Sequence, residues 1–275
     1  MAQYTPPLRD MQFLLHEVFD VSREFAAMPK HADVDAETIN AILEEGGKFA
    51  SEVLFPLNRS GDEQGCKLDQ QTHVVTTPTG FQDAYTQYVA GGWPALSCDP
   101  AFGGQGLPIV VNQCFYEMLN SANQAWTMYP GLTHGAYEAL HAHGTPEQQQ
   151  TYLPKMVSGE WTGTMCLTEP HCGTDLGLLR AKAEPQADGT YRITGQKIFI
   201  SSGEHDMAGN IIHLVLARLP DAPVGSKGIS LFVVPKFLVG ADGALGARNP
   251  IICTGLEHKM GIHGNATCQM TLDGA

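Results

Sequence analysis

The chain changes character at Trp161, and this change constrains the fold more than any other feature of the sequence. Before Trp161, apolar residues recur at helical spacing, as in residues 39–54 after a possible N-cap at Asp35. After it, short segments rich in β-branched and aromatic residues alternate with Gly, Pro, Asp and Asn. The 275 residues therefore divide into a helical domain, 1–160, and a β-domain, 161–275.

The helical part contains one run whose apolar residues fall largely on one face and one strong start signal. Thr145, Pro146 and Gln148 supply an N-cap, a proline at the first helical position and a capping-box glutamine. That helix should end between residues 154 and 159, and a preceding helix over 131–143 should end at Gly144. The one-sided run near the N-terminus comprises Leu8, Met11, Leu14, Leu15, Val18, Phe19 and Phe25.

The β part should form a small barrel or sandwich. Strands are expected at 161–167, 191–194, 197–201, 211–217, 229–234 and 268–272, and Asp188-Gly189 predicts a hairpin before Tyr191. This spacing does not fit alternating βαβ units. The expected fold class is α+β, with an all-α domain followed by a β-barrel or sandwich.

Charge and cysteine content exclude several classes of function. The formal net charge of −13 would repel nucleic acid and anionic membranes. No apolar stretch approaches the roughly 18 residues of a spanning helix, and the N-terminus has no signal-peptide pattern. Seven scattered cysteines without a CxxC pair favour reduced thiols. We expect a cytoplasmic protein without a membrane span or a nucleic-acid partner.

The segment MCLTEPHCGTD, residues 165–175, is the most informative polar motif. A strand delivers Thr168, a Glu-Pro turn follows, and the Cys-Gly-Thr-Asp loop offers backbone N–H groups and the Thr174 hydroxyl. Such donors suit an electron-rich heterocycle or a diphosphate. The alternative is that Thr168 and Thr174 only complete hydrogen bonds within turns.

A second motif, GQKIFISSG at residues 195–203, places Phe199 and Ser201 on the same face of a strand. An aromatic ring beside a small hydroxyl could form the wall of a site for a planar ring. The alternative is that Phe199 belongs to the core, as aromatic strand residues commonly do.

Together the two motifs resemble the acyl-CoA dehydrogenase family, in which a TEPxxGSD loop precedes a GxKxWITN strand. The segments GGW at 91–93, FGGQGL at 102–107 and KMGIHGNAT at 259–267 are similar to further family segments, in the same order. The segments PLRDM at 7–11 and GEWTGTMCL at 159–167 are similar to the branch that contains 3-methylmercaptopropionyl-CoA dehydrogenase.

The resemblance implies FAD held between the helical domain and the β-domain. Thr168 would bond near flavin N5 or O4, Gly173 and Thr174 would reach the flavin diphosphate or the substrate's pantetheine, and Phe199 would cover the ring. Phe199 stands where the family usually has Trp and lacks the indole N–H. The implied cofactor residues are Met165, Cys166, Leu167, Thr168, Gly173, Thr174, Phe199, Ile200 and Ser201, with Thr174 also at the substrate.

The resemblance also implies the reaction, α,β-dehydrogenation of an acyl-CoA with hydride transfer to flavin N5. The family's general base is a Glu on a C-terminal helical domain, so we expect it beyond Ala275, and Glu169 has a structural role in the family. The sequence is therefore interpreted as part of a longer enzyme, inactive alone. The implied partners are acyl-CoA, an electron-transfer flavoprotein as acceptor, and further subunits in a homodimer or homotetramer.

Three alternatives were weighed beside this interpretation. A related flavoprotein could act in binding or alkylation-damage response, and an acyl-CoA oxidase would use O₂ as acceptor. A metal site at Glu138, His141 and His143 is not expected, because histidines at i and i+2 diverge on a helix.

Overall fold

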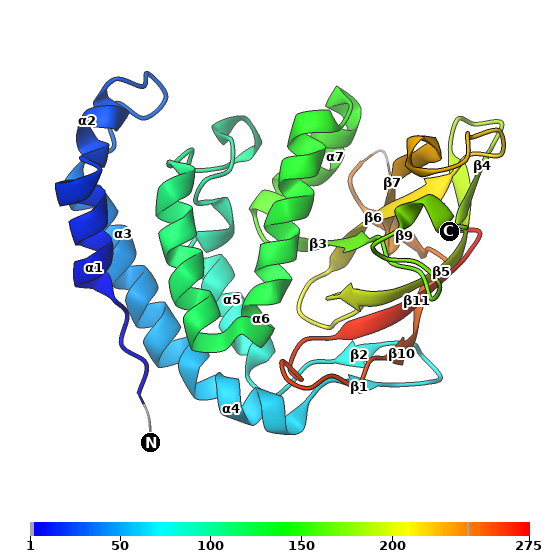
Figure 1. Ribbon diagram of the computed structural model, residues 1–275, viewed down its shortest axis with the longest axis horizontal. Helices are drawn as coiled ribbons and strands as arrows, with labels where there is room; N and C mark the ends of the chain where they lie inside the picture. Colours follow the sequence, from blue (N-terminus) through cyan, green and yellow to red (C-terminus); the bar gives the residue numbers. More distant parts are fainter. Residues whose placement is uncertain (1–2, 241) are drawn as a thin grey trace.

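The computed structural model describes residues 3–240 and 242–275, with helices at one end and a curled sheet at the other (Figure 1). The predicted α+β architecture is confirmed. None of the helices in this part of the chain combines the length and apolar character that crossing a bilayer requires. The helices are α1 (Leu8–Gln12), α2 (Val21–Ala26), α3 (Ala36–Lys48), α4 (Phe55–Gln64), α5 (Phe81–Ala90), α6 (Ile109–His143) and α7 (Pro146–Val157).

The strands form one curled seven-stranded sheet and two small hairpins. The sheet runs β10-β11-β5-β4-β6-β3, and β7 pairs with β6 on its other side. The hairpins are β1–β2 and β8–β9, and the Asp188-Gly189 turn joins β4 to antiparallel β5 as predicted. The strands are β1 (Lys67–Leu68), β2 (Val75–Thr76), β3 (Trp161–Cys166), β4 (Lys182–Pro185), β5 (Tyr191–Ser201), β6 (Asn210–Arg218), β7 (Ile229–Pro235), β8 (Phe237–Val239), β9 (Leu245–Arg248), β10 (Ile251–Leu256) and β11 (Thr267–Asp273).

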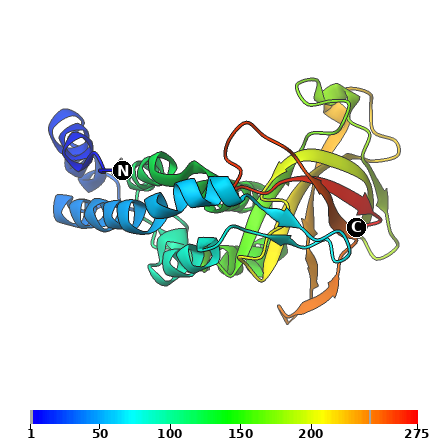
Figure 2. The same cartoon turned by 90° about the horizontal axis from the view of Figure 1, so that it is seen from below.

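The division at residues 160 and 161 remains a prediction, and the first part is not purely helical. The β1–β2 hairpin follows α4 and lies along the sheet (Figures 1 and 2). The His73 ring nitrogen Nδ1 lies 3.0 Å from the Cys253 carbonyl oxygen of β10 and ties the hairpin to the sheet. The helical part therefore contributes a small β element to the outside of the β part.

The N-terminal run does not form the single one-sided helix that its spacing predicts. It is divided into α1, a π-helical turn η1 (Phe13–Val18) and α2, which begins after Asp20 in a left-handed conformation with φ of 47°. Met11, Leu15 and Phe25 are buried, but Phe19 is 63% exposed. The π turn shifts the helical register, and Leu14 and Val18 are consequently also exposed.

The long helix α6 packs against β3 and carries the junction between the two parts. It bends at Asn123, whose φ of −158° and ψ of 85° are not helical, and it contains Pro130. The helix expected over 131–143 is therefore the last part of a longer, kinked helix. At the start of α7, the Thr145 hydroxyl accepts the Gln148 N–H and the Gln148 side chain accepts the Thr145 N–H, which confirms the predicted capping box.

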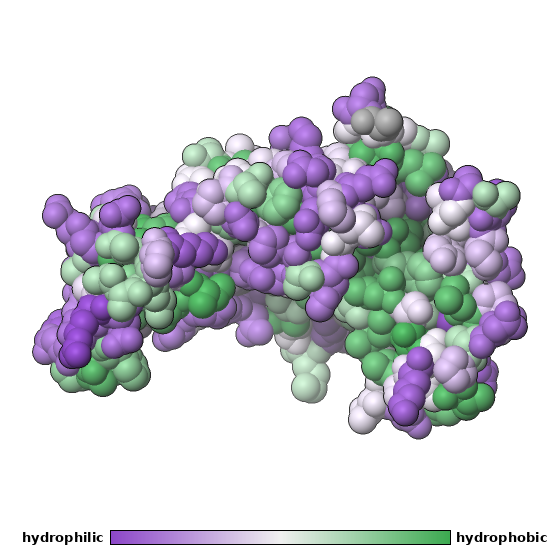
Figure 3. Space-filling view, turned by 90° about the horizontal axis from the view of Figure 1, so that it is seen from above, coloured by the Kyte–Doolittle hydropathy of each residue, from purple (hydrophilic) through white to green (hydrophobic). Residues whose placement is uncertain are grey.

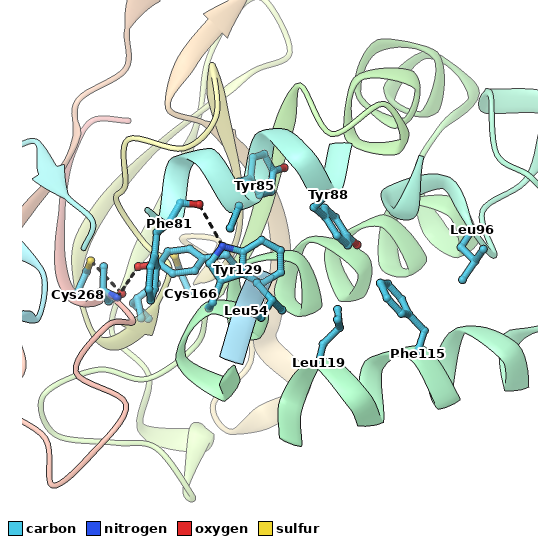
Figure 4. Close-up of a cluster of buried hydrophobic side chains, with 14 of the residues drawn as sticks. Leu54, Phe81, Tyr85, Tyr88, Leu96, Phe115, Leu119, Tyr129, Cys166 and Cys268 are labelled. Atoms are coloured by element: carbon cyan, nitrogen blue, oxygen red, sulfur yellow. Dashed lines mark hydrogen bonds between the residues drawn. The ribbon is translucent and has the colours of Figure 1, made fainter. Parts of the chain in front are cut away.

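An aromatic core joins the helices to the sheet. Figure 4 shows Tyr129 between the helical aromatic cluster and the cysteines of the sheet, Cys166 and Cys268. The Tyr129 hydroxyl donates to the Gly264 carbonyl at 3.1 Å and accepts the Ala266 N–H at 2.9 Å. This buried hydroxyl fixes the segment before β11 onto α6, so the helical part determines where β11 and its neighbour β5 lie.

Candidate functional site

The carboxyl end of β3 delivers the first predicted motif to the rim of the sheet. Beyond Cys166, the chain leaves the strand, and the Thr168 carbonyl accepts the Ile198 N–H at 2.9 Å. The loop therefore begins bonded to β5. Within residues 3–240 and 242–275, the hydroxyls of Thr168 and Thr174 form no hydrogen bond with protein. Turn bonds in this loop are made instead by the Glu169–Cys172 bridge and the Asp175 carboxylate.

A buried ion pair lies directly behind this loop. Glu169 is 3% exposed and Lys197 is fully buried, with 2.9 Å between the Glu169 Oε1 and the Lys197 Nζ. Glu169 also accepts the Arg180 N–H at 2.7 Å and the Ala181 N–H at 2.9 Å. The Lys197 ammonium additionally donates to the Leu167 carbonyl at 3.2 Å.

The environment of this pair shifts the pKa of each partner. Burial raises the pKa of the Glu169 carboxyl, but the Arg180 N–H, the Lys197 ammonium and the Ala181 N–H together bring that pKa below its ordinary value. Burial lowers the pKa of the Lys197 ammonium, and the Glu169 carboxylate opposes that shift. The pair therefore clamps the loop to β5 electrostatically, and Glu169 has no free oxygen with which to act as a base.

Phe199 lies in a β-bulge with its side chain 57% exposed. Ile200 pairs with Cys268 and Lys197 with Met270, so Ile198 and Phe199 together oppose Gln269. The φ of Phe199 is +56°, a conformation unusual for an aromatic residue. The alternative that Phe199 belongs to the core is wrong, since the bulge leaves a flat apolar ring open to solvent on β5.

The remaining predicted residues differ in which of their atoms a ligand could contact. Cys166 and Ile200 are fully within the core, so only their backbone atoms are able to face a ligand. Met165, Leu167, Gly173 and Ser201 are half-buried and Thr174 is exposed. The strand that precedes the first motif is also bonded to the second motif, since the Thr164 hydroxyl donates to the Ser201 carbonyl at 2.7 Å.

Two features at this rim were not predicted. Lys197 was not singled out, although a lysine between apolar strand residues is a recognisable anomaly, since lysine is almost never fully buried unless paired. Ligand atoms of Glu169, His171 and Cys172 also lie within 4.8 Å of one another. The Glu169 oxygens already accept hydrogen bonds from Lys197 and two backbone N–H groups. We therefore interpret the closeness of these three residues as part of the ion-paired loop and not as a metal site.

A large hollow with both polar and apolar lining lies elsewhere on the molecule. A space of about 1070 Å³ opens beside the edge strand β7, and Figure 3 shows apolar side chains gathered in a depression at the β end. Leu231 and Leu238 line it, together with Tyr152 of α7. None of the nine predicted cofactor residues lines this hollow. The candidate site is therefore an exposed rim of donors beside an aromatic ring.

Comparison with known families matches nearly the whole chain. The family described as "Acyl-CoA dehydrogenase, N-terminal domain" matches residues 36–160, and "Acyl-CoA dehydrogenase, middle domain" matches residues 164–275. The chain is 44% identical to 3-methylmercaptopropionyl-CoA dehydrogenase of Ruegeria pomeroyi over 99% of its own length and 46% of that protein. Against several such relatives it spans somewhat less than half of their length.

Solved structures show the same fold at lower sequence identity. Butyryl-CoA dehydrogenase from Megasphaera elsdenii aligns with a TM-score of 0.69 and 23% identity, covering 86% of this chain and 55% of that one. An acyl-CoA dehydrogenase from Bacillus anthracis, solved in complex with FAD, aligns with a TM-score of 0.68 and 21% identity, covering 89% of this chain and 36% of that one. These likenesses establish the arrangement of helices and sheet.

Proposed function

Because this chain belongs to the acyl-CoA dehydrogenase family, we propose that it supplies the helical and β parts of a flavoenzyme that converts an acyl-CoA to the 2-enoyl-CoA. The observation that carries the proposal is the rim described above. The hydroxyls of Thr168 and Thr174 lie on one loop and bond to none of the described residues, and the exposed ring of Phe199 lies on the strand bonded to that loop.

The residues of the rim fit FAD by their chemistry. An isoalloxazine has acceptor atoms along its polar edge and two flat faces, which call for N–H or hydroxyl donors beside an apolar plane. Thr168 and Thr174 provide the donors and Phe199 the plane. When bound, FAD would accept the hydride removed from the β-carbon. The residues Met165, Cys166, Leu167, Gly173, Ile200 and Ser201 complete the proposed contact set.

The chain's own residues then have distinct tasks. Thr168 would donate to the flavin edge, and the Phe199 ring would keep water from one face. Thr174 would contact the diphosphate or the pantetheine of the substrate. Glu169 does not remove the α-proton in this proposal, because its carboxylate is 3% exposed and paired with Lys197. Its role is to shape the loop.

Substrate, partners and location complete the proposal. We propose an acyl-CoA thioester as substrate, an electron-transfer flavoprotein as acceptor, and a homodimer or homotetramer. A cytoplasmic location is supported by the seven cysteines, all unpaired and five of them buried. The FAD content of the protein purified from its complete reading frame tests the cofactor. Anaerobic reduction of the bound flavin by an acyl-CoA tests the reaction.

Substitution of Phe199 should separate stability from flavin affinity. Phe199→Gly removes the ring and relieves the left-handed backbone, so we expect the free energy of unfolding to rise by about 0.5 kcal/mol while FAD affinity falls by about fivefold. Phe199→Ala removes the ring but keeps Cβ, so it should lose the same affinity without gaining stability. Urea unfolding and FAD titration measure the two effects. Unchanged FAD affinity in both variants would remove Phe199 from the proposed site.

A further inference from the structure

Lys197 is a fully buried cation whose position behind the rim calls for an explanation. Lys197 lies on β5, two residues before Phe199. Its ammonium contacts two oxygens, one from the residue before Thr168 and one from the residue after it. One contact is the Glu169 carboxylate at 2.9 Å and the other is the Leu167 carbonyl at 3.2 Å. A cation buried in this way costs solvation free energy, so the bonds it makes should matter to the loop.

The bond to Leu167 determines which way the next N–H points. The Leu167 carbonyl and the Thr168 N–H belong to one peptide unit, and no cis peptide bond occurs among the described residues. In a trans peptide the C=O and N–H point in opposite directions. Because the buried ammonium holds the Leu167 carbonyl toward the core, the Thr168 N–H is directed away from it.

The neighbouring bonds leave that N–H available. The Thr168 carbonyl is held by the Ile198 N–H, and the Glu169 N–H bonds to the Cys172 carbonyl. The Thr168 N–H itself has no hydrogen-bond acceptor among the described residues. The loop therefore fixes both carbonyls and the following N–H while leaving the Thr168 N–H available at the rim.

We propose that Lys197 is a positioning residue that presents the Thr168 N–H to the flavin. This inference rests on the proposed function, since it needs FAD at the rim. Glu169 balances the buried charge. A charge-assisted bond from Lys197 holds the peptide more firmly than a neutral donor would. If the ion pair were only structural, removing either partner would weaken FAD binding equally. If Lys197 positions the peptide, removing Lys197 should weaken FAD binding more than removing the charge of Glu169.

The test compares Lys197→Met with Glu169→Gln in the protein from the complete reading frame. Lys197→Met removes the bond to the Leu167 carbonyl, while Glu169→Gln keeps it and removes the charge partner. The double variant Lys197→Met/Glu169→Gln leaves no unpaired charge and should fold even if a single variant does not. FAD affinity is measured by titration of the flavin-free protein, together with the visible spectrum of the bound flavin.

We expect Lys197→Met and the double variant to weaken FAD binding by about tenfold and to shift the flavin spectrum, while Glu169→Gln stays within about threefold of the wild type. If the double variant binds FAD like the wild type, or Glu169→Gln weakens binding as much as Lys197→Met, Lys197 is not a positioning residue. Those outcomes leave the proposed function intact. A wild-type protein that binds no FAD would instead overturn the proposed function itself.

Discussion

Replacing Glu204 by Gln is expected to lower the free energy of unfolding by about 3–5 kcal/mol. Glu204 is 1% exposed and lies just beyond β5, where its carboxylate pairs with Lys236 and, at 2.9 Å, with Arg248. Buried His205 and His213 add no charge, because burial and then the nearby Lys236 ammonium lower the pKa of each to about 3. Without the carboxylate, the buried Lys236 ammonium and the half-buried Arg248 guanidinium would remain with no counter-charge.

Two further variants isolate the cause of that loss. Glu63→Gln breaks an exposed pair with Arg59 and should have no measurable effect on urea unfolding. Adding Lys236→Met to Glu204→Gln removes one of the uncompensated cations and should restore much of the lost stability. If Glu204→Gln unfolds within about 1 kcal/mol of the wild type, the buried charge cluster does not stabilise the sheet as described.

The second large effect is expected at Gly163, where α6 and β3 approach closely. A Cβ at this position would lie 2.5 Å from the Ala136 Cβ and 2.9 Å from the Met156 Cε. Gly163→Val should therefore push α6 and α7 away from the strand that delivers the candidate site. We expect a loss of about 3 kcal/mol in the free energy of unfolding, measured by urea or thermal denaturation.

Gly135 provides the matched control on the same helix. It lies in α6, and a Cβ there would meet nothing within 4 Å. Gly135→Ala should raise the free energy of unfolding by about 0.5–1 kcal/mol, because Ala is the better helix former. A Gly163→Val protein as stable as the wild type would show that the helix–strand contact tolerates a larger spacing.

Sequence signals predicted the elements that are stabilised by contacts between residues close together in the sequence. The Thr145 capping box and the Asp188-Gly189 hairpin were both confirmed, because each depends on residues a few positions apart. The strands expected at 191–194 and 197–201 proved to be one strand, β5, running through Gly195. A Cβ on Gly195 would lie 2.8 Å from the Ala181 Cβ, so this glycine marks a close approach of chains and not the end of a strand.

Some features that depend on contacts between residues far apart in the sequence were not predicted. The β1–β2 hairpin has two-residue strands, too short for any periodicity, and it is held by contacts with β10 far along the sequence. Strand alternation predicted that Phe199 and Ser201 share a face but could not show the bulge, because the extra residue is defined only by pairing with β11. The exposure of the ring is a consequence of that pairing.

The motifs of the candidate site could be predicted from the sequence, but the contacts that hold these motifs in place could not. The resemblance supplied the loop and the strand, and the structure shows them hydrogen-bonded to each other. The proposed role of Lys197 follows only from the structure, in which its ammonium reaches both Glu169 and the Leu167 carbonyl. Sequence spacing places Lys197 28 residues from Glu169 and gives no indication of that contact.

We expect this chain to help hold a flavin that oxidises acyl-CoA thioesters. The direct test is anaerobic addition of acyl-CoA substrates of graded chain length to the protein purified from its complete reading frame. The account predicts that FAD is bound and that at least one acyl-CoA bleaches its oxidised absorption and yields the 2-enoyl-CoA. A protein that carries FAD but is not reduced by any acyl-CoA in the series, or one that binds no FAD at all, would contradict it.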